Sequence, residues 1–372
     1  MRRKITVKAI TLVLLLISFT SYGKEETPKG DLKSEIKAYI DHHLLDSYDF
    51  ALTSYTDDNG KKVYWGFPLP VILWDGGLKV FSSSKFQHGE TLAKVDGNYY
   101  KLYHNKIYKT NAEGVINYDA EHHPTNAKPL DFSITKNVVV IFLVGMLMFF
   151  LFKGLGRSYA RNGGIAKGTG RFFEPIVLYI RDDIAIPNIG EKKYRKYMPY
   201  LLTVFFFVWF INLLGLTPLG VNVTNSISVT VSLALITFFI TNFTGTKDYW
   251  KHIFDPLGDS MPWYAKIPLY IILIPIEVLG MFIKPFSLLI RLYANIKAGH
   301  IVLMSLIGLM FLFKGWIGSP LSFGLTFAIS LIELLVALLQ AYIFTMLSAL
   351  YFGFAAETHD HAEEHEGEIQ HL

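Results

Sequence analysis

The chain contains no cysteine among its 372 residues. Disulfide bonds, thiolate metal sites and thiol nucleophiles are therefore excluded. Charged residues are also sparse, at 18% of the chain, and a formal net charge of +4 is too small to indicate a nucleic-acid-binding protein. The chain is instead 51% hydrophobic and 15% aromatic. This composition favours a membrane protein of several spans with a modest soluble part.

The first residues follow the pattern of a secretory signal peptide, which we assign to residues 1–23. Basic residues at positions 2–4 precede an apolar run at 9–19, and small and polar residues follow through Gly23. The run is well short of the roughly 20 residues that a membrane span needs, so we expect a signal peptide; an uncleaved anchor helix is the alternative. A signal peptide places the next segment outside the cytoplasm.

Residues 24–134 are soluble in character and form the expected extracytoplasmic region. Residues 31–45 are expected to be helical, and short aromatic and β-branched runs follow them. Pairs of turn-forming residues separate these runs, namely Asn59-Gly60, Asp75-Gly76, Asp96-Gly97 and Glu113-Gly114. Such pairs favour β-hairpins. We therefore expect a small antiparallel β-rich insert at about 47–129.

Apolar segments after this region predict five membrane-crossing helices within a membrane domain at 135–356. The first span includes residues 138–152. No charged residue occurs at 198–246, a segment long enough for two spans, which a turn near Pro218 divides. The last two segments cover 269–313 and 321–356. We also expect an interfacial helix at 171–184.

The loop charges predict the orientation of these helices. Lys and Arg are concentrated at 153–171 and 191–196, so that side is expected to face the cytoplasm, whereas the turn at 217–224 has no charge and is expected outside. The N-terminus is then extracytoplasmic, and the acidic, His-rich tail at 357–372 is cytoplasmic. The predicted fold is an all-α polytopic membrane protein with a small extracytoplasmic β-rich module.

The segment at 269–313 is the most informative part of the chain. As one helix it would be roughly 65–70 Å long, against about 30 Å for the hydrocarbon core, so it must tilt, bend or break. Pro275 and Pro285 are expected bending points. A charged side chain at membrane depth is costly, and such residues usually mark ion or proton paths. One stripe of the helix carries Glu277, Lys284, Ser287, Arg291, Asn295 and Ala298, and Ala294 lies just beside it.

The last apolar segment carries a single charged residue, Glu333, with Gln340 on the same face. Folding the two segments into a long tilted antiparallel hairpin places His300 at the depth of Glu333 and Arg291 at the depth of Gln340. A structural buried pair of His300 and Glu333 is the alternative to a functional one, and a Lys such as Lys284 near a span end can also extend to the headgroups.

Residues 284–300 resemble the signature of subunit a of F-type rotary ATP synthases. The family pattern is K-P-x-S-x-x-x-R-L-x-x-N-x-x-A-G followed by Glu or His, and this chain reads KPFSLLIRLYANIKAGH. Glu277 and the segments at 39–44, 229–235 and 338–344 also resemble the family. The resemblance covers roughly 36–46 and 130–356, and the β-rich insert departs from it. His300 and Glu333 stand where many bacterial members have the acid and the imidazole exchanged.

The resemblance implies a proton-channel stator that provides two half-channels beside a rotating ring of c subunits. Arg291 matches the essential arginine, which favours the ionised form of the passing ring carboxylate and separates the half-channels. Asn295 and Gln340 are expected to hold or hydrate it, with Lys284, Ser287, Ala294 and Ala298 in support. His300 and Glu333 suit the uptake half-channel, and Glu277 suits the release half-channel.

The implied partners are the c ring, the b subunits of the peripheral stalk, the rest of the complex and membrane lipid, in a bacterial inner membrane. No cofactor, metal or nucleic acid is expected, and the chain is not expected to be an enzyme itself. A secondary ion transporter or channel is the alternative function. A second alternative is a membrane metalloenzyme that uses the histidines of the tail. The chain has no H-E-x-x-H motif, which argues against this alternative. The β-rich insert is left with two candidate contacts, the peripheral stalk and lipid headgroups.

Overall fold

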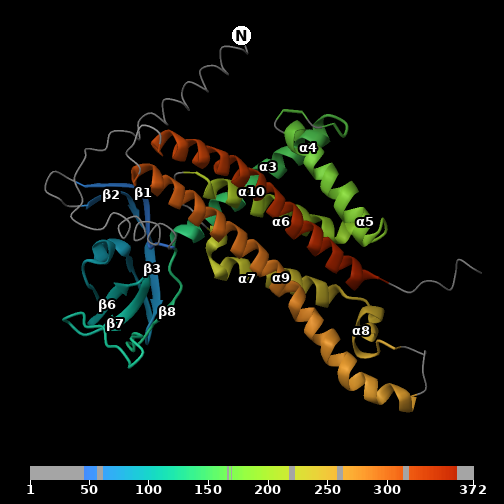
Figure 1. Cartoon of the computed structure of the whole chain (residues 1–372), viewed down its shortest axis with the longest axis horizontal. Helices are drawn as coiled ribbons and strands as arrows, with labels where there is room; N and C mark the ends of the chain where they lie inside the picture. The colour runs from blue at the N-terminus through green and yellow to red at the C-terminus, as the bar shows by residue number, and fades with distance from the viewer. Residues whose placement is uncertain are drawn as a thin grey trace, which may run out of the picture. The chain divides into compact units, whose positions relative to one another are not determined.

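The computed structural model describes residues 46–56, 62–165, 167–168, 170–217, 223–257, 263–312 and 318–357. The expected signal peptide, the helix expected at 31–45 and all of the tail after Glu357 lie outside these residues. The described part consists of a β-rich module followed in the chain by helices (Figure 1).

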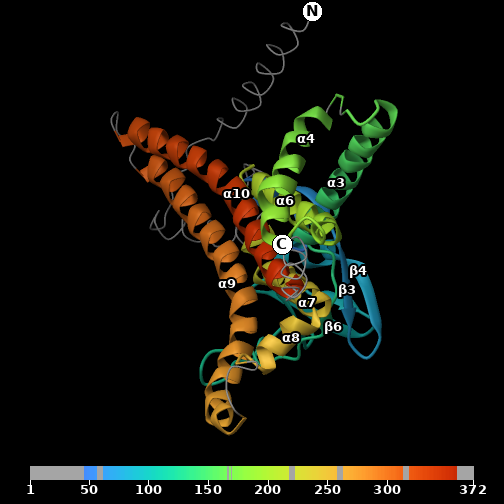
Figure 2. The ribbon, with the colours of Figure 1, turned by 90° about the vertical axis from the view of Figure 1, so that its right-hand side faces the viewer.

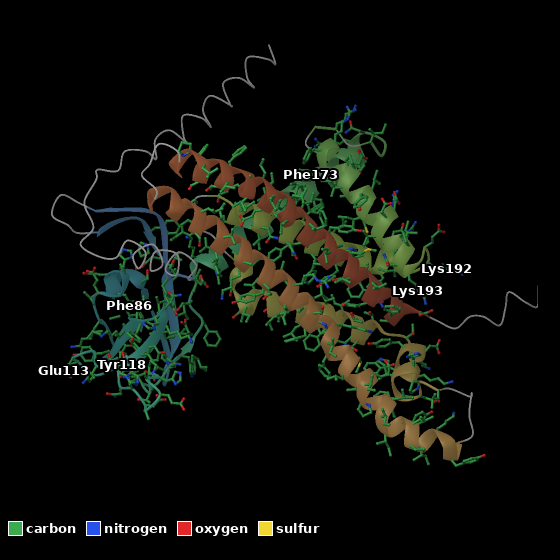
Figure 3. The ribbon with its side chains drawn as sticks, viewed as in Figure 1. Phe86, Glu113, Tyr118, Phe173, Lys192 and Lys193 are labelled. Atoms are coloured by element: carbon green, nitrogen blue, oxygen red, sulfur yellow. The ribbon has the colours of Figure 1, made fainter. Side chains whose placement is uncertain are left out.

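The described residues of the β-rich module form three small antiparallel sheets. Strands β1 (Asp49–Thr56) and β2 (Lys62–Pro68) form the first. The second has the order β4-β3-β8, and its strands are β3 (Pro70–Trp74), β4 (Leu78–Ser82) and β8 (Leu130–Asp131). The third has the order β5-β6-β7, with β5 (Ala93–Val95), β6 (Asn98–Tyr103) and β7 (Lys106–Thr110). Phe86, from the short helix η1 (Ser83–Gly89), is fully buried inside the module (Figure 3).

The hairpin predictions are confirmed at two of the four turn pairs. Asp75-Gly76 joins β3 to β4, and Asp96-Gly97 joins β5 to β6 with φ of +47° and +82°, the left-handed values of a two-residue hairpin turn. Asn59-Gly60 lies outside the described residues. The prediction at Glu113-Gly114 is wrong, because the chain after β7 is a loop held by the side chain of Asn126, whose amide donates to the carbonyls of Lys109 and Val115.

Five helices in the described residues are long and apolar enough to cross a membrane, as predicted. The chain is therefore a multi-pass membrane protein. These helices are α3 (Lys136–Arg161), α6 (Tyr194–Gly215), α7 (Ile227–Thr244), α9 (Trp263–Leu312) and α10 (Gly318–Ala356).

Shorter helices connect these spans. They are α4 (Gly170–Tyr179), η2 (Ile180–Ala185), α5 (Ile186–Ile189), η3 (Val223–Asn225) and α8 (Lys247–Phe254). The helix expected at 171–184 is present, but its second half is the π-helical turn η2, with Ile180 and Ile184 fully buried. The second half therefore packs into the helical core, whereas Phe172 in the first half is 66% exposed. An interfacial position for this helix stays a prediction.

Helix α6 lies in the centre of the helical core. The ring of Phe206 contacts Phe152 of α3 and Phe173 of α4 at centroid distances of 5.0 and 5.8 Å. On another face, Tyr197 stacks on Phe352 of α10 at 4.7 Å. These aromatic contacts hold α3, α4 and α10 against one helix.

Helices α9 and α10 lie side by side in both views (Figures 1 and 2). Helix α9 has 50 residues and remains one helix although Pro268, Pro275 and Pro285 lie inside it. It changes direction along its length, as both figures show. The expected bend is therefore present, without a break in the helix.

The module is joined to α3 where the chain enters the helix. The carboxylate of Asp46 accepts hydrogen bonds from the hydroxyl of Thr135 at 2.8 Å and from the backbone N–H of Asn137 at 3.1 Å. The N–H of Lys136 donates to the carbonyl of Ser47. An acidic group at the N-terminus of a helix satisfies its free N–H groups and suits the helix dipole.

Candidate membrane ion site

Arg291 lies near the middle of α9, and its side chain is exposed. Its neighbours Leu288 and Leu292 are 2% and 1% exposed and belong to the helical core. Helix α9 therefore turns its leucines inward and Arg291 outward. Within the described ranges, no ion pair joins Arg291 to another residue. The guanidinium is thus available to a group supplied from outside this part of the chain.

The other members of the predicted stripe lie on the same helix. Ala294 and Ala298 are exposed, and Glu277, Lys284 and Ser287 are half-buried. The small exposed residues beside Arg291 leave room for a closely packed neighbouring helix. Asn295 and His300 are in α9, but the structure does not describe their side chains. Their predicted contacts stay predictions.

Glu333 of α10 is 8% exposed and faces α9. A Cβ atom placed on Gly299 would lie 2.6 Å from its Oε1 atom. Both carboxylate oxygens are buried and have no hydrogen-bond partner within the described part of the chain. A buried carboxyl group without a partner is costly, and is expected mainly where protons or ions pass. The structure therefore brings Glu333 to the residue that precedes His300.

Gln340 of α10 is 3% exposed. It lies two helical turns after Glu333 and on the same side of α10, as the sequence predicts. Glu333 and Gln340 thus supply two buried polar groups at different depths along one helix.

Lys284 is held by aromatic side chains of α10. Its ammonium lies 5.8 Å from the ring centroid of Tyr351 and 5.5 Å from that of Phe354. A cation over an aromatic ring is stabilised by the ring quadrupole. Lys284 therefore ties α9 to α10 here, a structural role that the sequence pattern alone does not indicate.

Asn212 of α6 is a buried polar residue that the sequence reasoning missed. It is 6% exposed, and both amide atoms lack a hydrogen-bond partner within the described ranges. Tyr200 and Phe352 make an edge contact at 5.6 Å between α6 and α10. Helices α6 and α10 are antiparallel, and Asn212 follows Tyr200 by as many residues as Gln340 precedes Phe352. Asn212 is therefore at about the depth of Gln340. A search for intramembrane amides as well as charges would have found it.

No group of three or more His, Cys, Asp or Glu side chains in the described ranges is placed to hold a metal ion. The histidines of the tail lie outside these ranges. What the described site offers is an exposed arginine on one helix and buried carboxyl and amide groups on two others. That combination suits the transfer of protons or ions.

Comparison with known proteins decides the family. A family model described as ATP synthase A chain matches residues 138–353, which include all five spans in whole or in large part. The chain belongs to the ATP synthase subunit a family. A second model, described only as a domain of unknown function, matches residues 39–132. The first model thus accounts for most of the membrane domain, and the second covers most of the enlarged N-terminal region.

Curated relatives agree with this family. ATP synthase subunit a 2 of Chlorobaculum tepidum is 44% identical over 245 residues, which cover 64% of this chain and 66% of the relative. ATP synthase subunit a of Myxococcus xanthus is 42% identical over 243 residues, covering 63% and 77%. ATP synthase subunit a 2 of Prosthecochloris aestuarii is 38% identical over 319 residues, covering 82% and 94%. The match extends in this last case into the N-terminal region.

Proposed function

We propose that this chain is the proton-channel stator subunit of an F-type ATP synthase in a bacterial inner membrane. It would be a non-catalytic subunit that contacts a ring of c subunits and the b subunits of the peripheral stalk. The family match over residues 138–353 carries this proposal, because it includes Arg291 and every polar residue of the candidate site on α9 and α10. The outward side chain of Arg291 supports it, since the ring carboxylate must come from another chain.

In this proposal Arg291 favours the ionised form of each ring carboxylate that passes it. It thereby drives proton release and separates the two half-channels. Gln340 and Asn295 hold or hydrate the guanidinium. Ser287, Ala294 and Ala298 allow the ring helix to approach closely, and Lys284 fixes α9 against α10.

Glu333 and His300 form the proposed relay of the uptake half-channel. A carboxyl group and an imidazole can pass a proton between them because each can both accept and donate one. Glu277, on the opposite side of Arg291 along α9, belongs to the release half-channel. In the proposed orientation, with the N-terminus outside and the C-terminus in the cytoplasm, uptake is from outside. Helices α9 and α10 then form a long tilted hairpin across the membrane.

The test is ATP-driven acidification of inverted membrane vesicles. We expect Arg291→Ala to abolish pumping while the complex assembles in normal amount. Arg157→Ala, which removes an exposed arginine at the far end of α3, is the matched control and is expected to pump. Normal pumping by Arg291→Ala would overturn the proposal.

A second test examines the relay. Glu333→Ala and His300→Ala are expected to lower pumping by amounts that do not add in the double variant, because both residues serve one path. Strict additivity of the two losses would contradict a shared relay.

A further inference from the structure

The sheet β4-β3-β8 has one face that is apolar and exposed. Its side chains are Trp74, Leu78, Val80, Leu130 and Phe132, which are 54%, 61%, 58%, 63% and 65% exposed. We refer to these five residues as the outer apolar face. Strand pairing makes the face continuous, since Trp74 pairs with both Leu78 and Leu130, and Ile72 pairs with Val80.

The alternation of side chains along the strands produces this face. Val71, Leu73 and Phe81 point the other way and form the core of the module, where they are 0%, 0% and 7% exposed. On the exposed side of β3 and β4, no outward position is charged. A water-facing sheet normally carries polar residues at these positions. An exposed apolar surface of this kind marks a binding surface, and its lack of charge favours an apolar partner.

The outer apolar face is connected to the start of α3 by a short segment of hydrogen-bonded chain. Beyond β8 the sheet hydrogen bonds continue, because the N–H of Phe132 donates to the carbonyl of Ile72 at 2.9 Å and that of Ile134 to the carbonyl of Pro70 at 3.1 Å. The N–H of Lys136, the first residue of α3, then donates to the carbonyl of Ser47 at 2.9 Å. Phe132 is therefore within about 14 Å of the start of a membrane span.

The exposed surface at the start of α3 is also apolar. Val138, Phe142 and Leu143, close to the start of this helix, are 44%, 67% and 53% exposed. In a membrane these side chains face lipid. Aromatic side chains such as Trp74 and Phe132 are favoured at the level of the headgroups, where an apolar ring meets the edge of the hydrocarbon.

We propose that the outer apolar face rests on the lipid leaflet in which α3 begins and anchors the β-rich module at the membrane surface. The module would then bind lipid through five side chains of one sheet, in addition to its chain connection to α3. The inference requires only that α3 crosses the membrane. It does not depend on the role of Arg291.

This chain contains no cysteine, so a single variant gives a single nitroxide label once accessible cysteines of the other subunits have been replaced. Val80→Cys, labelled in the complete complex and reconstituted into liposomes, reports on the outer apolar face. Phe142→Cys on α3 is the lipid-exposed reference. Glu113→Cys is the water-exposed control, because Glu113 lies at the outer edge of the module (Figure 3). Collision rates of each label with oxygen, which concentrates in lipid, and with a water-soluble nickel complex are measured.

We expect the label at position 80 to show a ratio of oxygen to nickel collisions several-fold higher than the label at 113 and close to that at 142. A ratio equal to that at 113 would overturn the proposal, since the face would be in water. Protection of position 80 from both reagents would also overturn it, because a protein partner would then cover the face. If Val80→Cys prevents assembly of the complex, Leu78→Cys on the same strand provides the same measurement.

Discussion

The carboxyl group of Glu333 on α10 is packed against the backbone of Gly299 on α9, and no side chain separates them. Glycine is the residue that permits this approach, because a Cβ at position 299 would overlap with Oε1 at 2.6 Å. The two helices thus pack closely at a residue pair that includes an acid without a hydrogen-bond partner among the described residues. The position of that acid depends on the absence of a side chain on the opposite helix.

Gly299→Ala is expected to displace the carboxyl group of Glu333 and lower ATP-driven proton pumping by a few-fold to about 100-fold, since small displacements of a reacting group have effects of this size. Gly145→Ala on α3, where nothing lies within 4 Å of the added methyl group, is the control. Both changes raise helix propensity equally, so the difference between them reports the contact. Equal pumping by the two variants would contradict the importance of this approach.

Asn212→Leu is expected to lower pumping while leaving the melting temperature of the complex unchanged or higher. The amide of Asn212 is buried without a described partner, and replacing such a group by an apolar one of similar size removes a desolvation penalty. Asn242→Leu should instead lower the melting temperature and leave pumping per assembled complex unchanged. The reason is that the Asn242 amide is hydrogen-bonded: it donates to the carbonyl of Phe238 and accepts from the hydroxyl of Tyr249. Thermal unfolding and vesicle acidification, measured on both variants, distinguish an amide needed for pumping from an amide needed for stability. A lower melting temperature in Asn212→Leu would indicate a purely structural amide.

Gly353→Ala is expected to destabilise the helical core by about 1–3 kcal/mol, the usual cost of overpacking. A Cβ at Gly353 of α10 would lie 1.9 Å from the carbonyl oxygen of Asn188 in α5, so one helix must move. Gly154→Ala on α3 meets nothing within 4 Å and serves as the control. The measurement is the melting temperature of the purified complex, and an unchanged value for Gly353→Ala would contradict the close approach.

Asp75→Asn is expected to lower the melting temperature of the β-rich module at neutral pH. Hydrogen bonds from Lys109 and Tyr100 hold the pKa of Asp75 below its ordinary value, whereas burial and the bond to Asp75 raise the pKa of Tyr100 to about 12. A lowered carboxyl pKa contributes stability above the unfolded pKa of about 4, and this contribution is lost as pH falls through the folded pKa.

The difference in melting temperature between the wild type and Asp75→Asn should therefore be constant from pH 7 to about 5 and shrink below about pH 4. Asp96→Asn is the matched control. Its partner Lys79 also lowers the pKa of Asp96, but the Asp96 side chain is 65% exposed, and exposed pairs contribute little. Near-ultraviolet circular dichroism of the purified chain follows the unfolding. A difference that persists unchanged at pH 3 would show that Asp75 acts through something other than its charge.

The sequence predicts the membrane part well, because bilayer thickness and the cost of intramembrane charge leave few alternatives. The lengths of the apolar runs were sufficient to predict five spans. Arg291 and Glu333 were identified because each is a charge in an apolar helix. Asn212 was not identified, because an uncharged amide does not stand out within an apolar segment as a charge does. The contact of Lys284 with Tyr351 and Phe354 depends on how two helices meet, which residue spacing within one helix does not determine.

In the β-rich module the sequence predicts some turns and not others. Asp96-Gly97 was predictable because glycine favours positive φ, whereas the turn between β6 and β7 has no glycine. It uses His104 and Asn105 at φ of +45° and +59°. These residues tolerate the left-handed region less readily than glycine, so their presence is a weak signal. The outer apolar face could not be predicted for another reason. Alternation of side chains along a strand does not show which face of the sheet is buried.

Asp46, ahead of the β-rich module, binds Thr135 and Asn137, which follow it, so the chain leaves the module beside the point where it entered. An insert whose two ends meet can be lengthened, shortened or exchanged in evolution without redirecting the chain on either side. The spans would keep their order and their contacts with one another whatever is inserted at this point. The junction at Asp46 thus lets the β-rich module change in size without moving the start of α3.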